Sequence, residues 1–138
     1  MNKAVFKTHF ANLYHVALID HQLQKEELHL LYEIGERNGL SRNEIRELIT
    51  QSQSQSFAIP QAFEKRVSML FDLVSMMVVD GRLDEREAIL CNHLSKEMSL
   101  PLSMVNDLVK LIVSAQIEEL GADELQSELQ GYISEMQR

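Results

Sequence analysis

Apolar residues recur at intervals of three and four along almost the whole chain, which is the spacing of amphipathic helices. The first run covers about residues 3–19, and a second run ends at Gly39, a residue suited to the C-terminus of a helix. Ser41-Arg42-Asn43-Glu44 has the form of a capping box and predicts the start of a third helix. No segment rich in Val, Ile and Thr alternates between apolar and polar positions, so we expect no β-sheet.

The same periodicity continues through the second half of the chain. Asp84-Glu85-Arg86-Glu87 is a second capping box, headed by Asp, and Pro101 suits the first turn of a helix. Together these patterns predict an all-α fold of about seven helices, in a single domain over residues 1–138. The four helices of this half are expected over about residues 67–78, 84–98, 101–119 and 123–137.

A run of alternating Gln and Ser separates the two halves. Gln51-Ser52-Gln53-Ser54-Gln55-Ser56 offers no apolar side chain to a core, so we expect it to bury nothing and to form a linker. The alternative is that the run is the frayed end of the third helix. Pro60 follows shortly afterwards and is well placed to start the next helix.

The two halves match when the sequence is shifted by sixty residues. Asp20 and Glu27 then meet the identical residues Asp80 and Glu87, and each pair keeps its spacing to a central leucine. Several apolar positions also match, although two leucine-rich amphipathic patterns can agree by chance. We therefore expect an internal repeat of two similar three-helix halves followed by a C-terminal helix. The halves cover about residues 5–50 and 65–110.

Composition excludes several classes of function. The chain carries 13 Lys and Arg against 21 Asp and Glu, a net charge of −8 that would repel the phosphates of nucleic acid. A single cysteine excludes a disulfide framework and a thiolate zinc site, and it fits the reducing cytoplasm. The longest apolar stretch, Met76-Met77-Val78-Val79, is too short to cross a bilayer. We therefore expect a cytoplasmic protein with no direct membrane insertion.

The acidic segment from Asp80 to Glu87 is the main candidate for a functional site. Gly81 can adopt a positive φ and end the fourth helix, while Asp84 and Glu87 form the capping box of the fifth. Asp80 lies at a helix C-terminus, where the helix dipole opposes its negative charge. We expect a loop amide, a basic neighbour or a cation to compensate this charge. Asp20 repeats the same placement in the first half.

A divalent cation that bridges the two loops is one such compensation. The two loops provide only carboxylate oxygens as metal ligands, so Ca²⁺, Mg²⁺ or Mn²⁺ are the natural candidates. The loop is not a calcium-binding EF-hand, because Arg82 stands where an oxygen ligand is needed. The alternative is that the carboxylates serve only as helix caps and loop anchors. The expected ligands are Asp80 and Glu87, with Asp20 and Glu27 as a weaker second set.

The pattern Asp-Gly-x-Leu-x-x-x-Glu, which follows an apolar helix and precedes a second helix, resembles the TerB-like tellurite-resistance family. That family is also similar to the N-terminal region of some membrane-anchored J-domain co-chaperones. The resemblance covers about residues 5–120 and implies a duplicated all-helical fold with acidic residues gathered on one side, suited to divalent cations. The motif residues are Asp80, Gly81, Leu83 and Glu87, and Gly39-Leu40-Ser41 supplies the turn that the family has after its second helix.

No set of acid, base and nucleophile can be assembled from this sequence, so we expect a protein that is not an enzyme. Cys91 falls on an apolar helix face and is expected to be a buried thiol. The sequence thus predicts a non-enzymatic, stress-associated binding module of the TerB-like kind, which binds a divalent cation and a protein partner. The alternative is a metal-independent protein–protein interaction adaptor that uses the acidic C-terminal half. Both interpretations are compatible with a homo-oligomer.

Overall fold

Seven α-helices account for most of the computed structural model, which describes residues 2–19 and 23–138. Within these ranges the chain forms no strand beyond one isolated bridge between Val79 and Arg82. The all-α fold of seven helices that the periodicity predicts is therefore confirmed. The helices are α1 (Lys3–Ala17), α2 (Lys25–Arg37), α3 (Arg42–Gln53), α4 (Phe63–Met77), α5 (Glu85–Glu97), α6 (Ser103–Ile117) and α7 (Ala122–Met136).

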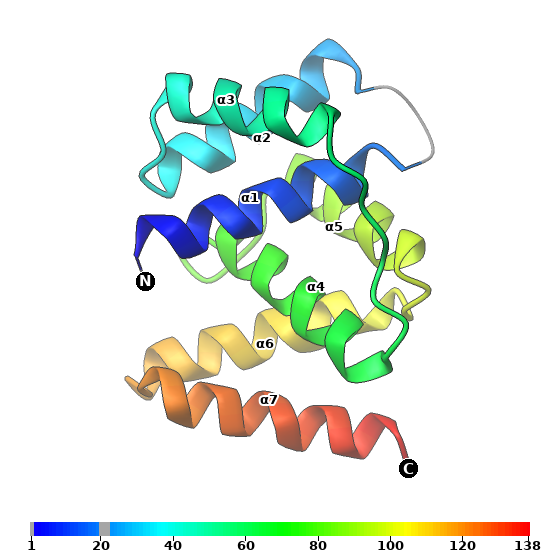
Figure 1. Cartoon of the computed structure of the whole chain (residues 1–138). Helices are drawn as coiled ribbons and strands as arrows, with labels where there is room; N and C mark the ends of the chain where they lie inside the picture. The colour runs from blue at the N-terminus through cyan, green and yellow to red at the C-terminus, as the bar shows by residue number, and fades with distance from the viewer. Residues whose placement is uncertain (1, 20–22) are drawn as a thin grey trace.

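The helices are stacked in three levels around α1 and α4 (Figure 1). α2 and α3 lie at the top of this view, α1, α4 and α5 in the middle, and α6 and α7 at the bottom. α1 packs against α3, α4 and α5, and α4 packs in turn against α5, α6 and α7. The core between them extends from Phe10 of α1 to Leu108 of α6 and includes Met76 and Met77. The two central helices therefore hold most of the others, and α2 packs mainly against α3.

α2 packs closely against the core at Gly35. A Cβ atom at Gly35 would lie 2.7 Å from Cδ1 of Ile45 in α3 and 3.3 Å from the ring of Phe10 in α1. In a close-packed interior there is no room for the extra carbon. Glycine at this position therefore allows α2 to lie directly against its neighbours.

The predicted capping box of α3 is present. The Ser41 hydroxyl accepts a hydrogen bond from the backbone N–H of Glu44 at 3.1 Å, and the Glu44 carboxylate accepts one from the Ser41 N–H at 2.9 Å. This backbone hydrogen bond, together with the ammonium groups of Lys3 and Lys7, lowers the pKa of Glu44 to about 2. Gly39 has a φ of +92°, as expected of the glycine that ends α2.

Two details differ from the sequence predictions. α3 continues into the Gln-Ser run as far as Gln53, and Ser52 is buried, so the prediction that this run buries nothing is wrong. The reason is that α3 packs along α1, and tertiary contacts hold a helical turn whose composition is polar. The prediction that Pro60 starts a helix is also wrong. α4 begins at Phe63, because the backbone is still extended at its N-cap residue, Ala62.

The helix boundaries repeat along the chain. α4 begins and ends sixty residues after α1, and α5 begins and ends sixty residues after α2. Within each half the first helix packs against the third, α1 against α3 and α4 against α6. These spacings are those expected of an internal repeat, which itself stays a prediction.

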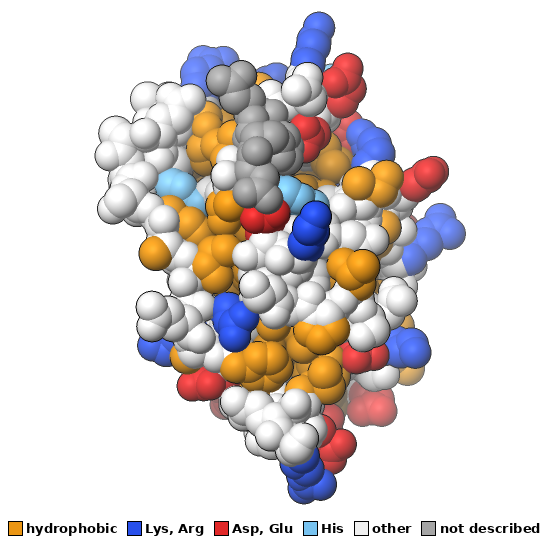
Figure 2. All heavy atoms as spheres, turned by 90° about the vertical axis from the view of Figure 1, so that its right-hand side faces the viewer, with side chains coloured by type: hydrophobic (Ala, Val, Ile, Leu, Met, Phe, Trp, Pro, Cys, Tyr) orange, Lys and Arg blue, Asp and Glu red, His pale blue; other side chains and the backbone are white. Residues whose placement is uncertain are grey.

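Several large apolar side chains are exposed at the surface. Ile89 of α5 is 64% exposed, and Ile117 at the end of α6 is 78% exposed. Figure 2 shows groups of hydrophobic side chains open on the face that is turned to the right in Figure 1, with charged side chains between and around them. None of the helices in residues 2–19 and 23–138 is both long enough and apolar enough to cross a membrane.

Candidate functional site

The loop between α4 and α5 has the conformation that its sequence predicts. Gly81 has a φ of +78°, and Asp80 beside it has a φ of +52°, a conformation that Asp tolerates better than most residues. The Asp84 carboxylate accepts a hydrogen bond from the Glu87 N–H at 2.8 Å, and the Glu87 carboxylate accepts one from the Asp84 N–H at 3.3 Å. The first of these bonds is the main reason why the pKa of Asp84 is lowered. The loop thus ends α4 and starts α5 as expected.

Glu87 is almost completely buried, with only 2% of its surface exposed. Its charge is met by Arg37 from the last turn of α2, whose Nη2 atom lies 2.5 Å from Oε2 of Glu87. The side chain of Arg37 is 34% exposed, so the pair lies at the edge of the core. A buried carboxylate needs such a partner, because removing an unpaired charge from water is strongly unfavourable.

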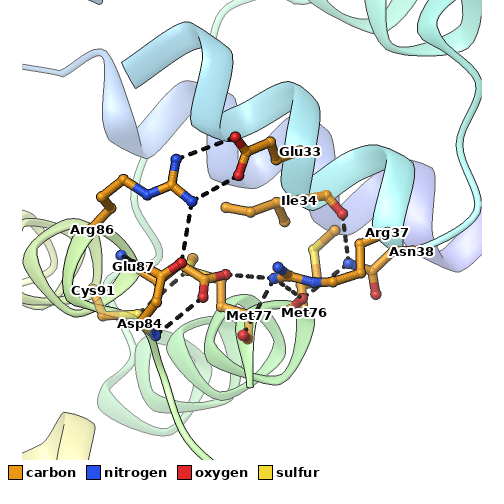
Figure 3. A network of polar contacts seen from close by, with 10 residues as sticks. All are labelled: Glu33, Ile34, Arg37, Asn38, Met76, Met77, Asp84, Arg86, Glu87 and Cys91. Carbon is orange, nitrogen blue, oxygen red and sulfur yellow. Dashed lines mark hydrogen bonds and ion pairs between the residues drawn. The ribbon is translucent and has the colours of Figure 1, made fainter. Parts of the chain in front are cut away.

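The guanidinium of Arg37 also caps the C-terminus of α4. Arg37 donates hydrogen bonds to the carbonyl oxygens of Met76 and Met77 at 3.4 and 3.3 Å, and the side-chain amide of Asn38 donates one to Met76 at 2.9 Å. Figure 3 shows these two side chains reaching from α2 to the point where α4 stops and α5 starts. The last carbonyl groups of a helix have no partner within the helix itself. Arg37 therefore joins three helix ends in one network.

A second, more exposed ion pair lies beside the first. Arg86 donates to both carboxylate oxygens of Glu33, at 3.2 and 2.8 Å, and to Asp84 at 3.2 Å. Its hydrogen bond to Glu33 is the main reason why the pKa of Glu33 is lowered. Residues 33 and 37 of α2 thus face residues 86 and 87 of α5. These contacts tie the C-terminal half of α2 to the start of α5.

The structure places the predicted cation ligands in different surroundings. Asp80 is exposed, whereas Glu87 is buried in its ion pair. Glu27 is half-buried and accepts a hydrogen bond from the N-cap backbone N–H of α2 at 3.1 Å. Asp20 lies outside the described residues. In the part of the chain that is described, no three His, Cys, Asp or Glu side chains form a group that could hold a metal ion. The cation site stays a prediction.

Cys91 is fully buried, as its place on an apolar helix face predicts. Its Sγ atom lies 3.5 Å from Sδ of Met77. Burial raises the pKa of the thiol to about 12, and the negative charge of Glu87 contributes a smaller part of this increase. Because the thiolate is the nucleophilic form of cysteine, a thiol with this pKa is unreactive at neutral pH.

An apolar groove lies between α2 and α5, next to the two ion pairs. Its volume is about 220 Å³. The leucines that line it are mostly buried, whereas its charged residues are exposed or half-buried. The groove is therefore an apolar surface with a charged rim. The lining residues are Ala17, Leu23, Glu26, Glu27, Leu30, Leu31, Arg86, Ile89, Leu90 and His93.

The groove lies beside the end of the helix pair that is away from the Arg37–Glu87 ion pair. Arg37 binds Glu87 at one end of the helix pair. Under the sixty-residue shift, Glu97 takes the place of Arg37 and Glu27 takes the place of Glu87. Two carboxylates cannot form the corresponding ion pair, so this end of the helix pair is not closed in the same way. The helices are tied at one end and separated by the groove at the other.

The sequence patterns do not identify Arg37 or the groove. An arginine in the last turn of a helix is common because it complements the helix dipole, so Arg37 alone carries no signal. The available signal is the contrast between Arg37 and Glu97 at equivalent positions of the two halves. A second signal is Ile89, an apolar residue whose equivalent in the first half is His29.

A comparison of this chain with models of protein families, with curated proteins and with solved structures finds no match. The resemblance to the TerB-like family therefore rests only on the sequence motifs of the acidic loop and of the Gly39-Leu40-Ser41 turn.

Proposed function

We propose that this protein is a non-enzymatic binding module that docks an apolar segment of another protein in the groove between α2 and α5. The observation that carries the proposal is the groove itself, whose leucine floor continues into the exposed side chain of Ile89. Leu30 and Leu90, from facing helices, contribute to that floor. Grooves of this kind between helices receive the apolar face of an amphipathic helix.

The two ion pairs give the groove a fixed frame. Arg37 and Glu87 hold one end of α2 against α5, and Arg86 and Glu33 hold the adjoining turn. A groove whose walls are already in place loses little conformational freedom when a ligand enters it. In this proposal the acidic loop has a structural role, because Glu87 positions α5 and needs no metal to do so.

The rim of the groove defines the chemistry of the partner. Glu26 and Glu27 lie at the rim on α2, so a partner helix gains from a Lys or Arg that flanks its apolar stripe. Ile89 offers apolar surface that a partner can cover. This is the metal-independent adaptor, with the α2–α5 groove rather than the acidic C-terminal half as its binding surface.

A synthetic leucine–lysine peptide of about 14 residues, long enough for about four helical turns, is a suitable probe. We expect the full chain to bind this peptide with a dissociation constant of about 10–100 μM in a fluorescence anisotropy titration. Ile89→Glu should weaken binding at least ~10-fold, because it places a charge on the apolar surface that the peptide covers.

Ile117→Glu is the matched control, because it adds the same charge at a side chain that does not line the groove. We expect this variant to bind the peptide as the wild type does. If both variants bind like the wild type, the peptide is held by the general negative charge of the chain and the proposal is wrong.

A further inference from the structure

A polar hollow lies between α1, α3 and the segment that follows α3. We call it the α1–α3 hollow. Its volume is about 320 Å³, and its described lining residues are all different from those of the α2–α5 groove. Figure 1 shows the segment after α3 passing the C-terminal end of α1. The Gln-Ser run, which the sequence predicts to be a linker, supplies Gln51, Ser52, Gln55 and Ser56 to the lining.

Phe57, the residue after this run, holds the segment against α1. Its ring is stacked on the imidazole of His15, with the ring centroids 4.7 Å apart and the planes 4° from parallel. Both residues are half-buried and line the hollow. Burial lowers the pKa of His15, so its imidazole is neutral at pH 7 and offers one donor and one acceptor nitrogen. The stack therefore gives the hollow a wall that carries no charge.

Ser52 brings a buried hydroxyl to the same hollow. The residue is only 4% exposed, and among the described residues its hydroxyl has no hydrogen-bond partner. Burying a hydroxyl without a partner is unfavourable. At the matching position of α6 under the sixty-residue shift, the buried residue is apolar, Ile112. Packing alone therefore does not require a hydroxyl here, whereas a polar ligand in the hollow gives it a partner.

Three side-chain amides line the hollow as well. The amides of Asn12, Gln51 and Gln55 have no hydrogen-bond partner in the part of the chain that is described. Each amide offers both donors and an acceptor. Among the described lining residues only Lys7 is charged at neutral pH, and its ammonium lies 3.3 Å from the carboxylate of Glu44. The hollow therefore presents a mixture of donors and acceptors whose one charge is already paired.

We propose that the α1–α3 hollow binds a neutral polyol of the size of one sugar ring, such as a hexose. A sugar hydroxyl both donates and accepts hydrogen bonds, which matches amides, a hydroxyl and a neutral imidazole. An anion only accepts and an ammonium only donates, so either would leave part of this set unpaired. Leu48 and Phe57 supply apolar surface for the C–H groups of the ring. This site is additional to the α2–α5 groove and does not depend on the proposed function.

The size of the hollow limits the ligand and its affinity. Sites for small molecules occupy about 300–1,000 Å³, so this hollow is at the lower end and holds about one sugar ring. A hexose has about twelve non-hydrogen atoms, and at the usual binding energy per atom it binds with a dissociation constant of about 1–10 mM.

Nuclear magnetic resonance of the side-chain NH₂ groups in the full chain tests this inference. The probes are D-glucose, D-galactose, D-mannose and D-ribose, each titrated to about 50 mM, which exceeds the expected dissociation constant. We expect at least one of the four sugars to shift the NH₂ signals of Asn12, Gln51 and Gln55 with a saturating dependence on concentration. The amide signals of residues that line the α2–α5 groove should stay unchanged, so the two sites are tested separately.

Gln51→Leu removes one amide and introduces the residue that α6 has at the matching position, Leu111. We expect it to weaken binding of the sugar about 5-fold, as does Ser52→Ala, because each removes a hydrogen-bonding group from the hollow. Gln53→Leu is the matched control, since Gln53 is exposed on the same helix and does not line the hollow. This control should bind the sugar as the wild type does. Backbone amide spectra that match the wild type away from the hollow show that the variants are folded.

Three results would overturn the inference. If none of the four sugars shifts these NH₂ signals, the hollow holds only water. If Gln51→Leu and Ser52→Ala bind the sugar as tightly as Gln53→Leu, the sugar is bound elsewhere. If D-glucose 6-phosphate binds more tightly than D-glucose, the hollow is a site for anions beside Lys7 rather than for a neutral polyol.

Discussion

The starts of α2 and α5 are built on the same capping arrangement but differ in what lies around them. Glu27 and Glu87 each accept a hydrogen bond from the N-cap backbone N–H of their own helix, at 3.1 and 3.3 Å. Glu87 is buried against Arg37, whereas Glu27 is half-buried and lines the groove. Under the sixty-residue shift, the position of Arg37 is held by Glu97, so the two positions differ in charge. We call the end of the helix pair that holds the Arg37–Glu87 ion pair the closed end, and the end beside the groove the open end.

The comparison shows that one capping arrangement can occur in two different surroundings within one molecule. The closed end ties α2, α4 and α5 together and needs no ligand. The open end leaves apolar surface between α2 and α5, which is where we propose that a partner binds.

Removing the guanidinium of the closed end should have the largest effect. Arg37→Met leaves the buried Glu87 carboxylate without its partner, and we expect the free energy of unfolding to fall by about 3 kcal/mol. Denaturant unfolding measures this change. Arg42→Met is the matched control, because Arg42 pairs with Glu36 at the surface and its loss should cost less than about 1 kcal/mol. Equal losses in the two variants would show that the closed end is no stronger than an ordinary surface ion pair.

The thiol beneath the closed end predicts a pH dependence of stability. Its pKa is about 12 in the folded chain against an ordinary value of 9.0, so folding favours the neutral thiol. The contribution of Cys91 to stability is therefore complete below pH 9 and is lost as the pH rises toward 12, by at most about 1.4 kcal/mol per pH unit. Cys91→Ala should show a shallower loss of stability over this range than the wild type.

The pKa of Tyr132 is also raised from its ordinary value of 10.0, mainly by burial, so some loss of stability above about pH 10 is expected in both proteins. Thiol-reagent labelling provides an independent measurement. The wild-type thiol should react slowly in the native chain and rapidly in denaturant. Rapid native labelling, or identical pH profiles for the wild type and Cys91→Ala, would contradict the burial of this thiol.

Divalent cations give the smallest expected effect. A cation that uses Asp80 and Glu87 has to compete with Arg37 for the Glu87 carboxylate. We therefore expect Ca²⁺, Mg²⁺ or Mn²⁺ at ten times its dissociation constant to raise the melting temperature of Arg37→Met by about 2–5 °C, and that of the wild type by less. Thermal-shift titrations measure both. If the wild type and the Asp80→Asn, Glu87→Gln double variant respond equally, the two carboxylates serve only as cap and loop anchor.

Local signals in the sequence predict most of the fold but only part of the site. Glycines, capping boxes and helical periodicity act within a few residues, and they place all seven helices and the Asp84–Glu87 box. The contact between Arg37 and Glu87 joins residues fifty positions apart, so it depends on packing that no local pattern contains. The groove is a property of two helices together and is likewise absent from either helix alone. At Pro60 a local signal gives a wrong prediction. It favours a helix start there, but α4 begins at Phe63.

The central claim is that the α2–α5 groove is the binding surface of this protein. The most direct test is an amide chemical-shift map of the full chain during titration with the leucine–lysine peptide. We expect the largest shifts at residues that line the groove, notably Leu23, Leu30, Ile89 and Leu90, and small shifts along α7. Largest shifts on the acidic residues of α7, with the groove unaffected, would contradict the claim and assign binding to the acidic C-terminal half.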